Sequence, residues 1–221
     1  MTKHPNYESN VFINCPFDDK YFELLQTLLF TITYYGFTPR IALGNSDSGQ
    51  PRLEKIVQLI RESKYSVHDI SRLKSSSINE YYRLNMPFEL GIDYGLRIFN
   101  TKYGDKRSLI LETDKFEYMH AISDINGFDI KNHHDIPDKL IECVRAWFSE
   151  TVKLTNLNSS GKVYVDFMDF NKKLFQIKMI KYVPEHNNTE AEQFAKKEID
   201  EMTIPEYIIE INNWLGENKN S

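Results

Sequence analysis

One carboxylate in this sequence is a candidate for chemistry because of the residues around it. Glu89 lies in the segment MPFELGIDYG, where its neighbours Met86, Pro87, Phe88 and Leu90 are apolar. A lone carboxylate in such surroundings suits reaction at an N-glycosidic carbon, where it can stabilise or attack an oxocarbenium-like transition state. A cationic leaving group departs without a proton, so one carboxylate suffices. The alternative role is structural, because an acid just after a helix-opening proline interacts favourably with the amino end of that helix.

A second polar set ends the preceding apolar run, SKYSVHDISR. It consists of His68, Asp69, Ser71 and Arg72. Polar groups that follow a strand in an open α/β sheet lie at the sheet edge where ligands bind. Each residue also has an ordinary interpretation. His68 can be a satisfied histidine of the core or of the strand end, and Asp69 can cap a turn or a helix.

Segments with strand and helix patterns alternate along the chain. Alternation with short links predicts a parallel, doubly wound α/β sheet of about five strands. The expected strands are 11–15, 37–43, 65–71, 106–112 and an edge strand made from Ile125 and 128–130. The expected helices are 20–35, a segment that begins at Pro51 and carries Ile56 and Ile60 on its inner face, 87–99, a short piece at 115–122, and 136–147.

The composition changes at residues 155–161, where the sequence reads TNLNSSG. Polar stretches of this kind separate structural units. We therefore expect an α/β domain over residues 1–155 and a small, helix-rich C-terminal extension over residues 156–221. Within the extension, the residues predict a short aromatic strand at 163–167, helical spacing after it, and a last helix at 205–215.

The carboxyl ends of parallel strands lie at one edge of a sheet, so the polar residues that follow them should converge. Arginines in this set can hold phosphate groups through charge-assisted hydrogen bonds. The Ser-Gly loop before Pro51 can bind a phosphate at the amino end of a helix, or it can be an ordinary turn. The expected substrate-binding residues are Asn14, Pro16, Phe17, Asp18, Arg40, Ser48, Gly49, Arg52, His68, Ser71, Arg72 and Met86.

Several function classes are not expected. The net charge of -5 over 221 residues argues against general nucleic-acid binding, which needs a phosphate-neutralising surface. The chain has no HExxH or CxxC pattern, so no metal site is predicted, and it has no Walker A, GxGxxG or GxSxG motif. No apolar run is long enough for a membrane span, and Cys15 and Cys143 lack a disulfide pattern, so we expect a cytoplasmic protein without membrane contact.

Three blocks of the sequence resemble the superfamily that joins TIR domains with nucleoside 2-deoxyribosyltransferase-like proteins. They are VFINCPFD, RLEKIVQLIRESKYSVHDIS and MPFELGIDYG, within a likeness that covers roughly residues 10–150. The resemblance implies a flavodoxin-like fold, with Glu89 at the catalytic glutamate and Asp69 as a second catalytic acid near the base or sugar. The basic and apolar stretch from Arg83 to Met86 lacks the acidic cluster of deoxyribosyltransferases, which favours the TIR-like branch.

The TIR-like branch implies an enzyme that cleaves the nicotinamide–ribose bond of NAD, with NAD as substrate and no cofactor. It also implies bacterial antiviral defence and assembly, either as a homo-oligomer or with a partner protein. Two alternatives stay open. One is a nucleoside or nucleotide N-glycosidase or deoxyribosyltransferase. The other is a non-catalytic nucleotide-binding or partner-binding signalling module, for which the aromatic residues of the extension, Tyr164, Phe167, Tyr207 and Trp214, are candidate contacts.

Overall fold

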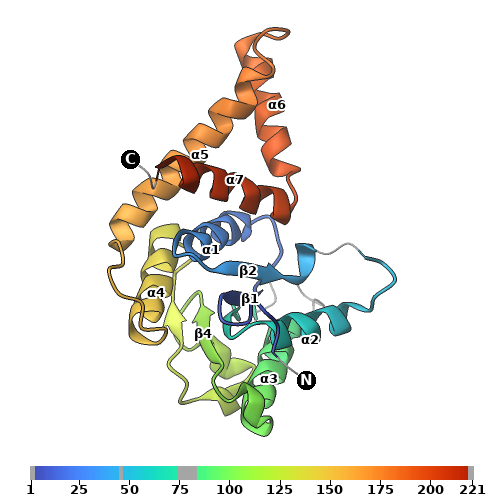
Figure 1. Ribbon diagram of the computed structural model, residues 1–221, viewed down its shortest axis with the longest axis vertical. Helices are drawn as coiled ribbons and strands as arrows, with labels where there is room; N and C mark the ends of the chain where they lie inside the picture. The colour runs from blue at the N-terminus through green and yellow to red at the C-terminus, as the bar shows by residue number, and fades with distance from the viewer. Residues whose placement is uncertain (1–2, 45–46, 74–83, 219–221) are drawn as a thin grey trace.

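The computed structural model describes residues 3–44, 47–73 and 84–218, and its centre is a five-stranded, all-parallel sheet (Figure 1). The strand order is β2-β1-β3-β4-β5. This is a flavodoxin-like, doubly wound α/β arrangement with additional C-terminal helices, as the sequence predicts. The strands are β1 (Asn10–Asn14), β2 (Thr38–Ile41), β3 (Tyr65–Asp69), β4 (Arg107–Glu112) and β5 (Lys131–Asn132).

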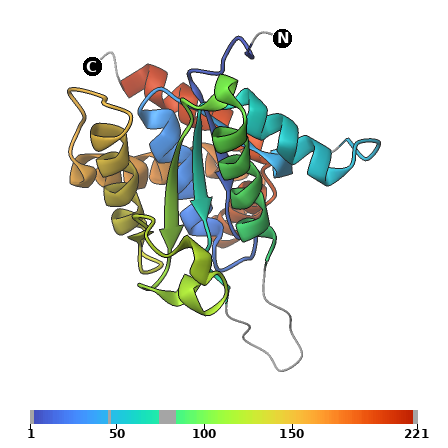
Figure 2. The ribbon, with the colours of Figure 1, turned by 90° about the horizontal axis from the view of Figure 1, so that it is seen from below.

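Helices cover both faces of the sheet. Figure 2 shows α1 and α4 on one side of the strands and α2 and α3 on the other. Short 3₁₀ turns occupy 42–44, 101–103, 117–120 and 123–125. The helices are α1 (Phe22–Tyr34), α2 (Arg52–Glu62), α3 (Asn85–Phe99), α4 (Pro137–Glu150), α5 (Ser160–Ile180), α6 (Asn188–Asp200) and α7 (Ile204–Asn218).

The central strands are buried on both faces, as their sequences require. All five residues of β1, NVFIN, and all five of β3, YSVHD, are buried. In the register between them, Asn14 lies beside His68. The chain leaves β1 into α1 on one face and β3 toward α3 on the other, so β1 and β3 form the topological switch point. In folds of this type the crevice at that point is the usual ligand site.

The C-terminal extension packs on the α1–α4 face through aromatic side chains. Helix α5 contacts α4 and α1, and α7 contacts α1. Phe30 of α1 is fully buried. Its ring centroid lies 5.4 Å from that of Phe167, 5.5 Å from Phe170 and 5.7 Å from Trp214. The apolar core is therefore continuous from the sheet through α1 into α5 and α7.

The structure corrects two expected strands. Residues 163–167 are helical and belong to α5, where Val163, Phe167, Phe170 and Leu174 are buried at helical spacing. The aromatic and β-branched composition of 163–167 suits a strand, but packing against α1 determines the outcome. The edge strand is Lys131–Asn132 rather than Ile125 and 128–130, because residues 123–125 form a 3₁₀ turn. The helical piece expected at 115–122 is the 3₁₀ turn 117–120.

The aromatic contact between α1 and the extension gives a stability prediction. We expect Phe30→Ala to lower the free energy of unfolding by about 3–5 kcal/mol, because a large ring leaves a cavity in a closed core. Urea unfolding followed by circular dichroism measures this change. Phe99→Ala is the matched control, since that ring is 89% exposed. It should change stability by less than about 0.5 kcal/mol. Similar losses in both variants would contradict the continuous core.

Candidate functional site

Four titratable groups gather at the carboxyl ends of β1 and β3. Cys15, which follows β1, is fully buried. Burial and the nearby negative charges of Asp69, Glu89 and Asp18 raise the pKa of its thiol well above the ordinary value. Cys15 is therefore a neutral thiol among three acids that come from different parts of the chain. The predicted convergence of Glu89, Asp69 and Asp18 on this edge is present in the structure.

Glu89 is a nearly buried carboxyl group on the second turn of α3. Its side chain lies on the buried side of the helix, and the residue is only 8% exposed. Burial raises the pKa of Glu89 from 4.5 to about 7, against the opposing charge of Arg52. Within the described residues, the side chain of Glu89 has no hydrogen bond and no ion pair. The helix begins at Asn85 without a side-chain cap, so Glu89 is not its capping residue.

A chain of buried polar side chains holds α3 against the sheet. The Nδ2 of Asn14 lies 2.8 Å from the carbonyl oxygen of Met86 and 3.1 Å from Nδ1 of His68. The Nε2 of His68 lies 3.0 Å from Oδ2 of Asp93, whose other oxygen lies 3.1 Å from Nζ of Lys106. Because the Asn14 amide donates to Nδ1, the His68 proton resides on Nε2 and is donated to Asp93. Asn14 and His68, both predicted to bind substrate, are thus parts of the support beneath Glu89.

The charges of Asp93 and Lys106 determine the ionisation of both side chains. Burial alone would raise the pKa of Asp93, but His68, Lys106 and Ser66 outweigh burial and lower it to about 2. Burial lowers the pKa of Lys106, and Asp93 opposes this change. Lys106 is fully buried and also donates to the carbonyl oxygens of Ile60 and Ser63. The pair is therefore ionised and multiply hydrogen-bonded, which is the form in which a buried charge is tolerated.

Asp69 belongs to a second buried network. Its Oδ2 accepts from the hydroxyl of Tyr21 and lies 3.0 Å from Nε2 of His133, and its Oδ1 accepts from the backbone N–H of Ser71 at 2.9 Å. Burial would raise the pKa of Asp69, but His133 and these hydrogen bonds lower it. Asp69 is thus an ionised, fully occupied acid that orders the end of β3. Its expected alternative role in turn structure is present in the bond to Ser71.

The contacts of His133 exclude a nucleophilic triad at Ser71. The hydroxyl of Ser71 lies 3.1 Å from Nε2 of His133, the same nitrogen that contacts Asp69. The other nitrogen, Nδ1, accepts from the backbone N–H of Asp135 at 3.1 Å. A serine relay needs the hydroxyl and the carboxylate on opposite ring nitrogens. This trio therefore organises the edge of the sheet.

The three predicted phosphate-binding arginines differ in their availability. Arg40 pairs at 2.7 Å with Glu62, at the far end of α2, and Arg72 pairs at 2.7 Å with Asp135. Arg52, the first residue of α2, forms no ion pair within the described part of the chain, and its guanidinium lies 5.9 Å from the ring centroid of Phe17. Arg52 is thus the arginine that is available to a ligand beside Glu89.

The remaining predicted residues lie around this edge. Pro16 is buried and Phe17 is 39% exposed. Ser48 and Gly49 lie in an exposed turn, in which the side chain of Asp47 accepts from the backbone N–H of Gly49 at 2.9 Å. This contact favours ordinary turn chemistry for the loop. Met86 contributes its carbonyl oxygen to Asn14, while its side chain packs in a core cluster. Arg83 and the serines at 75–77 lie outside the described residues.

Sequence reasoning missed Tyr21, Cys15 and His133 as members of the site. His133 is 64 residues from Asp69 in the chain, so only the pairing of β5 beside β4 brings the two together. Within the described ranges, no cluster of three or more His, Cys, Asp or Glu residues is arranged to hold a metal ion. No described helix combines the length and apolar character of a membrane span.

Comparison with known proteins gives no family: no family model, no curated protein and no solved structure matches this chain. The resemblance to TIR-like and deoxyribosyltransferase-like proteins therefore stays a prediction from the three sequence blocks.

The buried ion pair gives a stability prediction. We expect Lys106→Met to lower the free energy of unfolding by about 3–5 kcal/mol, because it leaves Asp93 as an uncompensated buried charge. Adding Asp93→Asn should recover part of that loss, and a double-mutant cycle by urea unfolding measures the coupling. Lys131→Met breaks the exposed pair with Asp129 and should cost less than about 1 kcal/mol. Additive effects of Lys106→Met and Asp93→Asn would refute the pairing.

Replacing Glu89 is expected to raise the free energy of unfolding, whereas replacing Lys106 lowers it. The pKa of Glu89 is higher in the folded than in the unfolded protein. Below pH 4.5 the group is protonated in both states and does not change the free energy of unfolding. As the pH rises from 4.5 to about 7, its ionisation in the unfolded protein lowers the free energy of unfolding. Above that range the cost is about 3 kcal/mol. We therefore expect Glu89→Gln to stabilise the protein at pH 8 and to change it little at pH 5, measured by urea unfolding at both pH values. The exposed Glu54→Gln is the control and should show no pH-dependent gain. A loss of stability in Glu89→Gln at pH 8 would contradict this account.

Proposed function

We propose that this protein cleaves the nicotinamide–ribose bond of NAD, with Glu89 as the carboxylate beside the ribose. The observation that carries the proposal is the nearly buried side chain of Glu89 at the topological switch point of the sheet, which is unpaired among the described residues. An unpartnered carboxyl group in such a position reduces stability, and proteins retain such groups at functional sites. The proposal agrees with the TIR-like resemblance of the MPFELGIDYG block.

The chemistry matches the electrostatics of Glu89. As the bond from C1′ to the pyridinium nitrogen breaks, both electrons move to the nitrogen, nicotinamide leaves neutral, and positive charge develops on the ribose. A carboxylate that has few other partners stabilises a cation formed next to it more strongly than a carboxylate that is already paired. Water then adds to C1′ and loses its proton to solvent, which gives ADP-ribose. The cationic leaving group needs no general acid, so the commitment of Asp69 to Tyr21 and His133 is no obstacle.

Neighbouring residues suit the rest of such a substrate. Arg52 is available for the diphosphate and lies close enough for its charge to act on Glu89. Phe17, which packs near Arg52, offers an apolar surface to a base. In this proposal the protein acts in the cytoplasm, in bacterial antiviral defence, and assembles as a homo-oligomer or with a partner protein. The defence role and the assembly come from the resemblance alone, and the cytoplasmic location comes from the cysteine pattern and the lack of a long apolar run.

One observation favours a second candidate, a nucleoside N-glycosidase or deoxyribosyltransferase. With a pKa of about 7, Glu89 is partly protonated at neutral pH. A protonated carboxyl group can donate to a neutral leaving base, which an ionised one cannot. Base exchange between a deoxynucleoside and a free base would identify this activity. A nucleotide-binding module without catalysis would instead show thermal stabilisation by NAD without turnover.

The test of the first proposal is nicotinamide release from NAD at several pH values. We expect wild-type kcat/KM to rise with pH and to reach half its plateau near pH 7, because Glu89 must be ionised. Glu89→Gln should lower kcat/KM by at least about 100-fold, a typical effect of removing a group that stabilises charge in the transition state. The assay is run over a range of protein concentrations, so that assembly is not limiting. Glu54→Gln, which changes an exposed acid of α2, is the matched control. Equal rates for Glu89→Gln and wild type would rule the proposal out.

A further inference from the structure

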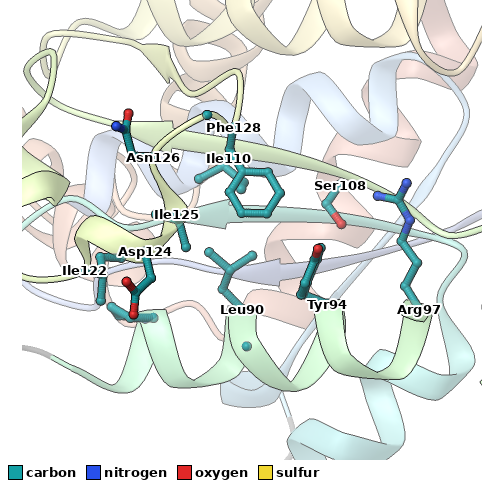
Figure 3. A pocket seen from close by; sticks show the side chains of 13 residues that line it. Leu90, Tyr94, Arg97, Ser108, Ile110, Ile122, Asp124, Ile125, Asn126 and Phe128 are labelled. Atoms are coloured by element: carbon teal, nitrogen blue, oxygen red, sulfur yellow. The ribbon is translucent and has the colours of Figure 1, made fainter. Parts of the chain in front are cut away.

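A hollow lies on the other side of α3 from Glu89. It has a volume of about 560 Å³ and is bounded by α3, β4 and residues 122–128 (Figure 3). Its walls are mostly apolar, from Leu90, Tyr94, Ile110, Ile125 and Phe128. The rings of Tyr94 and Phe128 meet edge to face, with their centroids 5.4 Å apart. Its volume is in the range of small-molecule sites.

The hollow exists because the segment between β4 and β5 contains no full helix to cover β4 beside α3. Between β4 and β5 there are only the two short 3₁₀ turns at 117–120 and 123–125. A crossover between parallel strands usually contains a helix that would pack beside α3. Gly91 widens the space further, since a Cβ atom placed there would meet nothing within 4 Å. The glycine is therefore not required by local packing, and its missing side chain leaves the hollow open.

The two ends of the hollow carry opposite charges. Figure 3 places Arg97 at one end of the α3 wall, and Asp124 at the other, near Leu90. Neither Arg97 nor Asp124 forms an ion pair or a side-chain hydrogen bond within the part of the chain that the structure describes. Arg97 follows Leu90 by seven residues, which corresponds to about 10 Å along the helix. The apolar hollow thus has an available cation, Arg97, at one end and an available anion, Asp124, at the other.

We propose that this hollow binds a small monocarboxylate with an aromatic or branched apolar body and a hydrogen-bond donor at its far end. The carboxylate would pair with Arg97 and the donor would reach Asp124. Arg97 lies in the last turn of α3, where the helix dipole is negative and disfavours a doubly charged phosphate. Asp124 excludes a second anionic group at the other end. The inference does not depend on the proposed cleavage of NAD, because its residues and those around Glu89 lie on different faces of α3.

The first test compares probes that share one body and differ in their charged group. The probes are 4-phenylbutyrate, 4-phenylbutylamine and 4-phenylbutanol, and binding is measured by saturation-transfer NMR and titration calorimetry. We expect 4-phenylbutyrate to bind at least tenfold more tightly than the other two. A fourth probe, 4-(4-aminophenyl)butyrate, should bind more tightly than 4-phenylbutyrate in the wild type but not in Asp124→Asn. Absence of binding by every probe, a preference for the amine, or equal affinity of the two acids would overturn the proposal.

The second test uses variants of the hollow. Arg97→Gln should weaken 4-phenylbutyrate binding at least tenfold, whereas Arg61→Gln, an arginine in the last turn of α2, should leave it unchanged. Gly91→Leu should abolish binding by filling the space, while raising the thermal midpoint because leucine favours the helix. Unchanged binding in Gly91→Leu, or equal effects of the two arginine variants, would place the probe elsewhere. Self-association of the wild type that Gly91→Leu removes, without probe binding, would show an interface between copies and overturn the proposal.

Discussion

The ion pair between Asp93 and Lys106 is the constraint on which the arrangement of α3 depends. Both side chains are withdrawn from water, so each must remain paired and hydrogen-bonded or the helix must move. The pair fixes the middle of α3 to β3 and to the end of α2, and Asn14 fixes its first turn through Met86. One helix thus holds Glu89 rigidly on one face and the wall of an apolar hollow on another.

Two buried acids at this sheet edge have opposite environments, and the difference separates their roles. Asp69 is surrounded by donors, which lower its pKa, while among the described residues the charge of Arg52 alone opposes the effect of burial on Glu89. The first arrangement stabilises the fold and the second reduces its stability. A group whose retention costs folding free energy is better explained by binding or catalysis than by architecture. The burial of Glu89 therefore distinguishes the two acids, although both occupy the same edge.

Much of the fold follows from the sequence, because alternating buried strands and amphipathic helices leave little choice of topology. The positions of Glu89 and Asp69 at one edge follow as well. The sequence does not reveal partners that only tertiary packing creates, such as Glu62 for Arg40 or His133 for Asp69. Local propensity also misassigned residues 163–167, whose composition suits a strand until α1 is beside them. The start of α6 does have a local signal in the sequence, the capping box of Asn187 and Glu190.

The contact of Phe30 with the last helix has a consequence for synthesis of the protein on the ribosome. Trp214 follows Phe30 by about 180 residues, and translation at about 5–20 residues per second separates their appearance by roughly 10–40 s. During that interval the outer side of α1 lacks its cover, so a nascent sheet presents aromatic surface to its surroundings. The contact of Phe30 with Trp214 can therefore form only after α7 has been synthesised, so this part of the core is completed late.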